Sequence, residues 1–79
     1  DLAVFDSEGN PVMLAECKAP SVNIKQAHFE QISIYNKIQK APYLLVTNGL
    51  QHYCCYWDKN SNQYQFLSDL PEYRNLFSH

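Results

Sequence analysis

The sequence predicts a small α/β domain with a mixed β-sheet and one long crossover helix, in the order β-β-α-β-β-β. Two strand-like apolar runs separated by a turn open the chain, at residues 2–5 and 12–17. One segment of helical periodicity follows, at about residues 24–40, and three further strand-like runs come after it. A helix of that length can form a right-handed crossover, which makes the strands on either side of it parallel.

Composition indicates one folded domain spanning residues 1–79. Hydrophobic residues make up 46% of the chain and aromatic residues 14%, which excludes disorder as a general description. The core of so short a chain is marginal. A net charge of −2 argues against a domain that binds nucleic acid tightly by its own charge.

The cysteines indicate a reduced, cytosolic protein. Cys17, Cys54 and Cys55 are an odd number, and they form neither a C-x-x-C motif nor a spacing suited to zinc. Cys55 or Cys17 is expected to pack as a small apolar residue. No apolar stretch approaches the length of a membrane span.

The first two strands are expected to pair as an antiparallel hairpin around the turn at residues 6–10. Glu16 and Lys18, at the end of the second strand, stand two residues apart and so point to the same side. Ligands in such sheets tend to bind beyond the carboxyl ends of parallel strands, which is where this acid and base lie. Taken alone, the two residues are better explained as a solvated ion pair than as part of a site.

The helix is expected to begin at a capping box formed by Asn23 and Gln26 and to end before Pro42. Its predicted buried stripe recurs at three- and four-residue steps and consists of Ile24, Ala27, Gln31, Tyr35 and Ile38, with Ile34 beside them.

Three strands are expected after the helix. Residues 43–47 read as a strand buried on both faces, and Asn48-Gly49 is a strong turn signal. An aromatic-rich strand at residues 51–57 and a further strand at 63–67 follow, and their aromatic side chains are expected to form hairpin core or a subunit interface rather than a base-stacking platform. A short last helix is expected at residues 71–77.

A candidate metal site joins the two ends of the first hairpin. Antiparallel pairing can bring Asp1 beside Glu16, and two carboxylates that lie close together repel each other unless a cation lies between them. Carboxylate and carbonyl oxygens are the ligands that Mg²⁺ selects. Lys18 could then orient or deprotonate a water that attacks a phosphodiester.

These residues resemble a known pattern. Asp1 followed by Glu16-Cys17-Lys18 is similar to the D…(D/E)-x-K core of the PD-(D/E)XK nuclease superfamily. Gln31 and Tyr35 match the Q-x-x-x-Y motif of its RecB-like branch, and residues 44–49 are similar to a strand in the N-terminal nuclease domain of type I restriction enzyme R subunits. The resemblance runs from residue 1 to about residue 57.

The resemblance implies a restriction-endonuclease-like fold and a Mg²⁺-dependent endonuclease that hydrolyses DNA. It implies Asp1, Glu16 and the Cys17 carbonyl as metal ligands, Lys18 near the attacking water, and Gln31 and Tyr35 as residues that position the substrate. Ser33 and Asn48 are weaker candidates for phosphate contacts. The first helix and first strand of the superfamily core are missing from the chain, which is therefore expected to be a truncated piece of the domain.

Partners and location follow from the same resemblance. The implied partners are DNA and the modification and specificity subunits of a restriction complex, in a prokaryotic cytoplasm, with ATP used only in the rest of the parent enzyme. The alternative is a non-catalytic DNA- or protein-binding scaffold that retains the nuclease fold. A homodimer formed through the first strand is a further expectation.

Overall fold

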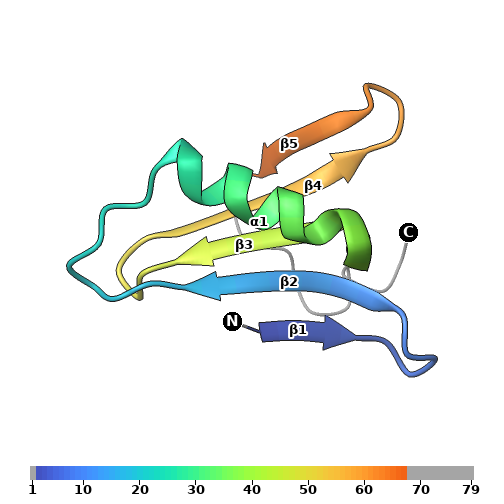
Figure 1. Cartoon of the computed structure of the whole chain (residues 1–79), viewed down its shortest axis with the longest axis horizontal. Coiled ribbons are helices and arrows are strands. Elements are labelled where there is room, and N and C mark those ends of the chain that lie inside the picture. Colours follow the sequence, from blue (N-terminus) through green and yellow to red (C-terminus); the bar gives the residue numbers. More distant parts are fainter. Residues whose placement is uncertain (1, 68–79) are drawn as a thin grey trace.

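The computed structural model describes residues 2–67, and it contains five strands and one helix (Figure 1). In chain order these are β1 (Leu2–Phe5), β2 (Pro11–Cys17), α1 (Gln26–Gln39), β3 (Tyr43–Thr47), β4 (His52–Asp58) and β5 (Gln63–Leu67). The order of elements agrees with the sequence prediction. Asp1 and the helix predicted at residues 71–77 lie outside the described residues.

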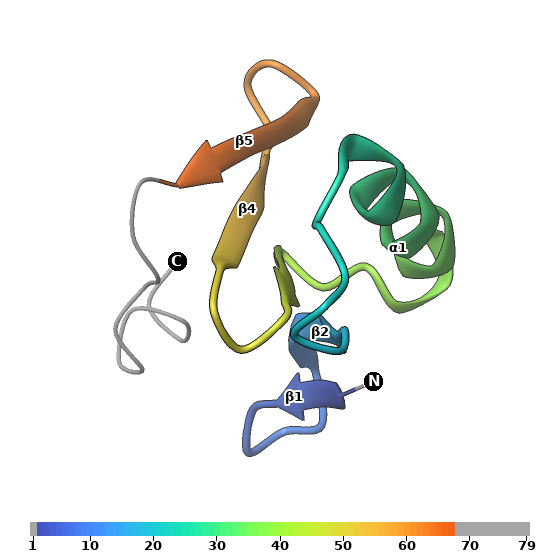
Figure 2. The same ribbon diagram turned by 90° about the vertical axis from the view of Figure 1, so that its left-hand side faces the viewer.

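The sheet is mixed, as predicted. Its strands lie in the order β1-β2-β3-β4-β5, and β2 and β3 are parallel while every other neighbouring pair is antiparallel. Helix α1 makes the crossover between the two parallel strands and lies along one face of the sheet (Figure 2). The carboxyl ends of β2 and β3 therefore meet at one edge of the fold, where the polar residues of interest are found.

The helix begins two residues later than predicted. Its N-cap is Lys25, whose extended backbone precedes the first turn. The Lys25 N–H donates to His28 Nδ1 at 2.9 Å, so a side chain inside the helix satisfies the N-cap amide. The predicted capping box of Asn23 and Gln26 is wrong, because His28 supplies this acceptor and residues 23–25 are not helical.

The helix ends at Gln39, close to the predicted end, because Lys40 takes the left-handed conformation at φ 56°. The Lys40 N–H donates to the Asn36 carbonyl at 2.7 Å and so closes the last turn. Pro42 follows within two residues and cannot continue the helix.

The buried stripe of α1 differs from the predicted stripe. Phe29, Ile32 and Asn36 are the buried residues of the helix. Ala27 and Gln31 are exposed, and the exposed fractions of Tyr35 and Ile38 are 64% and 82%. The prediction was wrong because apolar residues occupy two sides of this helix, and the side that packs on the sheet includes a polar residue, Asn36, which the pattern passes over.

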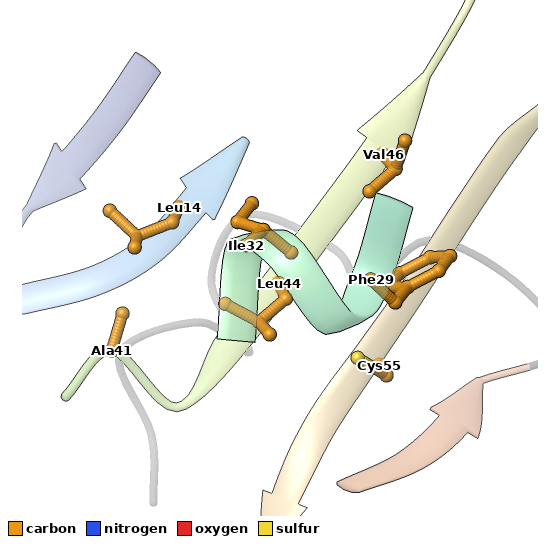
Figure 3. Close-up of a cluster of buried hydrophobic side chains, with 7 residues drawn as sticks. All are labelled: Leu14, Phe29, Ile32, Ala41, Leu44, Val46 and Cys55. Atoms are coloured by element: carbon orange, nitrogen blue, oxygen red, sulfur yellow. The ribbon is translucent and has the colours of Figure 1, made fainter. Parts of the chain in front are cut away.

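Two hydrophobic clusters lie on the two faces of the sheet. The cluster beneath the helix is shown in Figure 3 and comprises Leu14, Phe29, Ile32, Ala41, Leu44, Val46 and Cys55. The other contains Met13 and Cys54, with Val4, Tyr43, Leu45 and Leu67 packed against them. Leu44 and Val46, in β3, are fully buried, so the central strand anchors the core under α1.

The aromatic side chains of β4 and β5 form only part of a hairpin core, because Tyr53 and Phe66 stay 40% and 56% exposed. Trp57 meets Tyr64 edge to face at 5.0 Å between ring centroids, and Phe66 meets Phe29 of α1 in the same way at 5.0 Å. These contacts tie the outer hairpin to itself and to the helix.

Asn36 joins the end of the helix to the sheet. Its Nδ2 donates to the Ala41 carbonyl at 2.8 Å and to the Tyr64 hydroxyl at 3.0 Å, and its Oδ1 accepts from the Ala41 N–H at 2.8 Å. A buried amide is stable only when its polar atoms are satisfied, and here both are. Asn36 therefore has a structural role at the entry to β3.

Candidate functional site

Glu16 and Lys18 form an ion pair at the carboxyl end of β2. The Lys18 Nζ lies 3.3 Å from Glu16 Oε1, and the exposed fractions of the two side chains are 27% and 17%. The pair predicted from the spacing is therefore formed, and it is substantially shielded from solvent, unlike a freely solvated surface pair. Shielding an ion pair costs desolvation, and this penalty can exceed the attraction between the two charges.

The second carboxylate oxygen of Glu16 has no hydrogen-bond partner among residues 2–67. Glu16 Oε2 is buried, and none of the described groups donates to it. A buried acceptor without a donor loses its hydration and gains nothing in exchange. This oxygen is therefore free to accept a hydrogen bond from a bound molecule or to bind a cation.

The backbone carbonyl of Cys17 points to the β1 side of β2. The Lys18 N–H donates to the Thr47 carbonyl of β3 at 2.7 Å. No peptide bond is cis in the described chain, so the carbonyl of the same peptide unit, that of Cys17, points in the opposite direction. It is directed to the side where Leu2, the first described residue, pairs with Ala15.

A cleft between α1 and the β1–β2 hairpin adjoins this end of the sheet. Its volume is about 470 Å³. The residues that line it are Leu2, Ala3, Leu14, Ala15, Glu16, Gln31, Ile32, Ile34 and Tyr35. Most of them are apolar, so Glu16, Gln31 and Tyr35 supply the polar groups of the cleft.

The structure thus brings together three of the predicted site residues, and a fourth joins them through the ion pair. Glu16, Gln31 and Tyr35 share the cleft, and Lys18 contacts Glu16. Gln31 and Tyr35 are both exposed and stand one turn apart on α1, where they can contact a bound molecule. Asp1 lies outside the described residues.

The oxygen donors of the site suit a hard divalent cation. Within residues 2–67, no three His, Cys, Asp or Glu side chains gather closely enough to hold a metal ion. Glu16 Oε2 and the Cys17 carbonyl are both oxygen donors, the type that Mg²⁺ prefers, and Mg²⁺ commonly keeps several water ligands. The described donors therefore fit Mg²⁺ as part of a ligand set that also needs water or a further carboxylate.

The two weaker phosphate candidates are already engaged. Asn48 is 4% exposed, and its Nδ2 donates to the Val22 carbonyl at 2.9 Å. The Ser33 hydroxyl donates to the Glu30 carbonyl at 2.8 Å. A phosphate contact by Asn48 is excluded by its burial, and sequence reasoning missed the structural bond that it makes across the fold.

The three cysteines differ in environment, and all are free thiols. Burial raises the pKa of the Cys54 thiol to about 11. Burial, together with the neighbouring Cys54, raises the pKa of the Cys55 thiol to about 12. The prediction of an apolar packing role is confirmed for Cys55, which is buried, and is wrong for Cys17, which is exposed at the end of β2.

We expect a thiol reagent to modify Cys17 in the native protein, and to modify Cys54 and Cys55 only after unfolding. Because folding raises the pKa of both buried thiols, their contribution to stability is complete below about pH 8.5, the pKa of a free thiol. It is lost as the pH rises through about 11 for Cys54 and about 12 for Cys55. The urea midpoint should therefore fall over this range, and it should fall less in Cys55→Ala.

Cys17→Ala is the matched control for both measurements. It should remove the fast-reacting thiol and leave the alkaline fall in the urea midpoint unchanged. Rapid modification of two or more thiols in the native protein would contradict the burial of Cys54 and Cys55.

Together these features define a small α/β domain in which an acid–base pair ends a parallel strand beside a largely apolar cleft. A family model described as "Type I restriction enzyme R protein N terminus (HSDR_N)" matches residues 1–71. The chain therefore belongs to this family, and the predicted resemblance to the N-terminal domain of type I restriction enzyme R subunits is confirmed. No curated protein and no solved structure matches the chain. The one helix in residues 2–67 is not of the length and apolar character that crossing a membrane requires.

Proposed function

We propose that this domain is the Mg²⁺-dependent endonuclease part of a type I restriction R subunit and hydrolyses phosphodiester bonds in DNA. The observation that carries the proposal is the state of Glu16. One of its oxygens is paired with Lys18 at 3.3 Å, and the other is buried at the end of a parallel strand without a donor among the described residues. An acid held in this way, with a base beside it, suits metal-assisted hydrolysis.

The proposal assigns Asp1, Glu16 and the Cys17 carbonyl as the groups that hold Mg²⁺. When bound, Mg²⁺ would supply electrostatic stabilisation of the charge that develops on the phosphate. Support comes from the oxygen character of the described donors and from the direction of the Cys17 carbonyl, toward the start of β1.

Lys18 is proposed to hold the attacking water and take part in moving its proton. Glu16 holds its ammonium group at 3.3 Å, beside the carboxylate that is proposed to bind the metal ion. Gln31 and Tyr35 are proposed to orient the DNA backbone, since both are exposed polar groups on the α1 side of the cleft.

The wider context is proposed from family membership. The fold is proposed to be restriction-endonuclease-like, and the partners to be DNA and the modification and specificity subunits of a cytoplasmic restriction complex, with ATP used elsewhere in the parent enzyme. A homodimer through β1 stays a prediction, and light scattering that finds only monomer would contradict it.

Glu16→Gln tests the proposal. It keeps the size of the side chain but removes the charge that would bind the cation, so both Mg²⁺ binding and Mg²⁺-dependent nicking should be lost. Binding is measured by isothermal titration with Mg²⁺ or Mn²⁺. Nicking is measured as relaxation of a supercoiled plasmid, with and without a chelator.

Glu30→Gln is the matched control, because Glu30 is an exposed acid on α1 that does not line the cleft. It should bind Mg²⁺ and nick DNA like the unaltered chain. Nicking at an unchanged rate in Glu16→Gln would end the proposal.

The second candidate function is a non-catalytic, protein-binding scaffold. The exposed apolar residues beside the cleft favour it, since Leu2, Ile34 and Ile38 have exposed fractions of 60%, 64% and 82%. Apolar side chains suit a protein contact better than a phosphate backbone. No heat of Mg²⁺ binding to the unaltered chain, and no change on mutating Glu16, would favour the scaffold.

A further inference from the structure

We propose that Asn48 is a positioning residue for Lys18: its side chain clamps the segment that begins with Lys18 against the carboxyl end of β3. The effect of the clamp on catalysis rests on the proposed function, whereas the clamp itself rests on hydrogen bonds alone. Asn48 does not line the cleft and so acts through Lys18.

The side chain of Asn48 has two separate roles. Its Oδ1 accepts from the Leu50 N–H at 2.9 Å and from the Gln51 N–H at 2.7 Å, which shapes the turn between β3 and β4. Its Nδ2 donates to the Val22 carbonyl at 2.9 Å, far away in sequence. The first role is local to the turn, and the second reaches the segment that follows β2.

The segment at residues 18–22 is held at both ends by consecutive residues of the chain. The Lys18 N–H donates to the Thr47 carbonyl at 2.7 Å, and the Val22 carbonyl accepts from Asn48. Between these anchors, the Val22 N–H donates to the Ala19 carbonyl at 2.9 Å and closes a turn. The backbone that follows Lys18 therefore depends on the Asn48 side chain for its second anchor.

This dependence matters because Lys18 lies just beyond the last residue of β2. Its Nζ reaches Glu16 across 3.3 Å, so a shift of the backbone changes the contact between acid and base. Misplacing a reactive group by about 1 Å can lower a rate by about a hundredfold. A buried donor–acceptor pair far from the chemistry can thus control how well Lys18 works.

Asn48→Asp separates the two roles. The aspartate keeps acceptor oxygens for the turn but loses the N–H donor to the Val22 carbonyl. Asn36→Asp is the matched control, because Asn36 is also a buried amide with three hydrogen bonds, none of them to residues 16–22. If Asn48→Asp does not fold, Asn48→Ser is the second variant, since its short hydroxyl can accept from the turn.

Three readouts are compared at urea concentrations where the two variants are equally folded. Relative to Asn36→Asp, Asn48→Asp should show faster hydrogen exchange at the Lys18 amide and unchanged Mg²⁺ affinity. It should also show a kcat for nicking that is lower by about tenfold or more with little change in KM. These differences would not arise if Asn48 contributed only to overall stability.

Equal Lys18 amide exchange in the two variants would overturn the proposal, and so would equal kcat values. Failure of the proposed function has a different signature, because the unaltered chain would then show no Mg²⁺-dependent nicking at all. In that case amide exchange at Lys18 still decides whether Asn48 acts as the clamp.

Discussion

Replacing Lys18 with methionine is expected to lower the rate of Mg²⁺-dependent nicking by about 10²- to 10⁴-fold while Mg²⁺ still binds. Methionine keeps an unbranched side chain of similar length and removes the ammonium group. Among residues 2–67, Glu16 then has no cationic partner, so its carboxylate remains available to a metal ion and should bind it at least as tightly. Titration calorimetry and plasmid nicking on the same preparation measure the two effects.

Lys59→Met is the control for loss of a positive charge, because Lys59 is exposed in the turn between β4 and β5. It should leave nicking unchanged. If Lys18→Met removes Mg²⁺ binding as well, the lysine supports the site structurally and has no separate part in the chemistry. Together with Glu16→Gln, this variant separates metal binding from proton transfer.

Ile32→Ala is expected to lower the free energy of unfolding by about 2–5 kcal/mol, whereas Ile38→Ala should change it by about 0.5 kcal/mol or less. The two residues have the same chemistry and lie on the same helix, but their exposed fractions are 7% and 82%. Ile32 packs in the cluster with Leu44 and Phe29, so its truncation leaves a cavity. Urea unfolding followed by circular dichroism measures both variants.

The loss in Ile32→Ala is large against the total stability of a domain, which is typically about 5–15 kcal/mol. A partly unfolded protein at room temperature is therefore a realistic result, and the urea midpoint of Ile38→Ala serves as the reference. Equal losses in the two variants would contradict the orientation of α1 on the sheet.

The strands could be predicted from the sequence because each signal was local and unambiguous. Turn residues separate apolar runs at residues 6–10 and at Asn48-Gly49, and the structure has strands on both sides of each. The length of the helical segment was enough to predict that β2 and β3 are parallel. These features depend on neighbouring residues alone.

The orientation of the helix could not be predicted in the same way. Ile32 and Ile38 are both isoleucine, and which one is buried depends on partners from the sheet that periodicity does not contain. Asn36 is buried because Ala41 and Tyr64 satisfy its amide; Ala41 lies just after the helix, whereas Tyr64 comes from β5, a distant part of the chain. Tertiary contacts therefore decided what the local pattern left open.

The acid–base pair of the candidate site was predictable, but its support was not. Alternation along a strand was sufficient to place Glu16 and Lys18 together. The clamp by Asn48 could not be found, because an Asn-Gly pair in a turn gives no sign of a bond to Val22. Local spacing reveals the reactive groups, whereas their positioning comes from contacts across the fold.

The parallel pairing of β2 with β3 has a consequence for how the protein folds. The β1–β2, β3–β4 and β4–β5 pairs are each joined by a short turn and can form early. Among the strand pairs of the sheet, only the pairing of β2 with β3 closes a long loop, the one that contains α1, and closing it costs more chain entropy. The hydrogen bond from the Lys18 N–H to the Thr47 carbonyl continues that pairing. The candidate site is therefore assembled only when the two halves of the sheet meet, so a partly folded chain carries the residues of the site without its geometry.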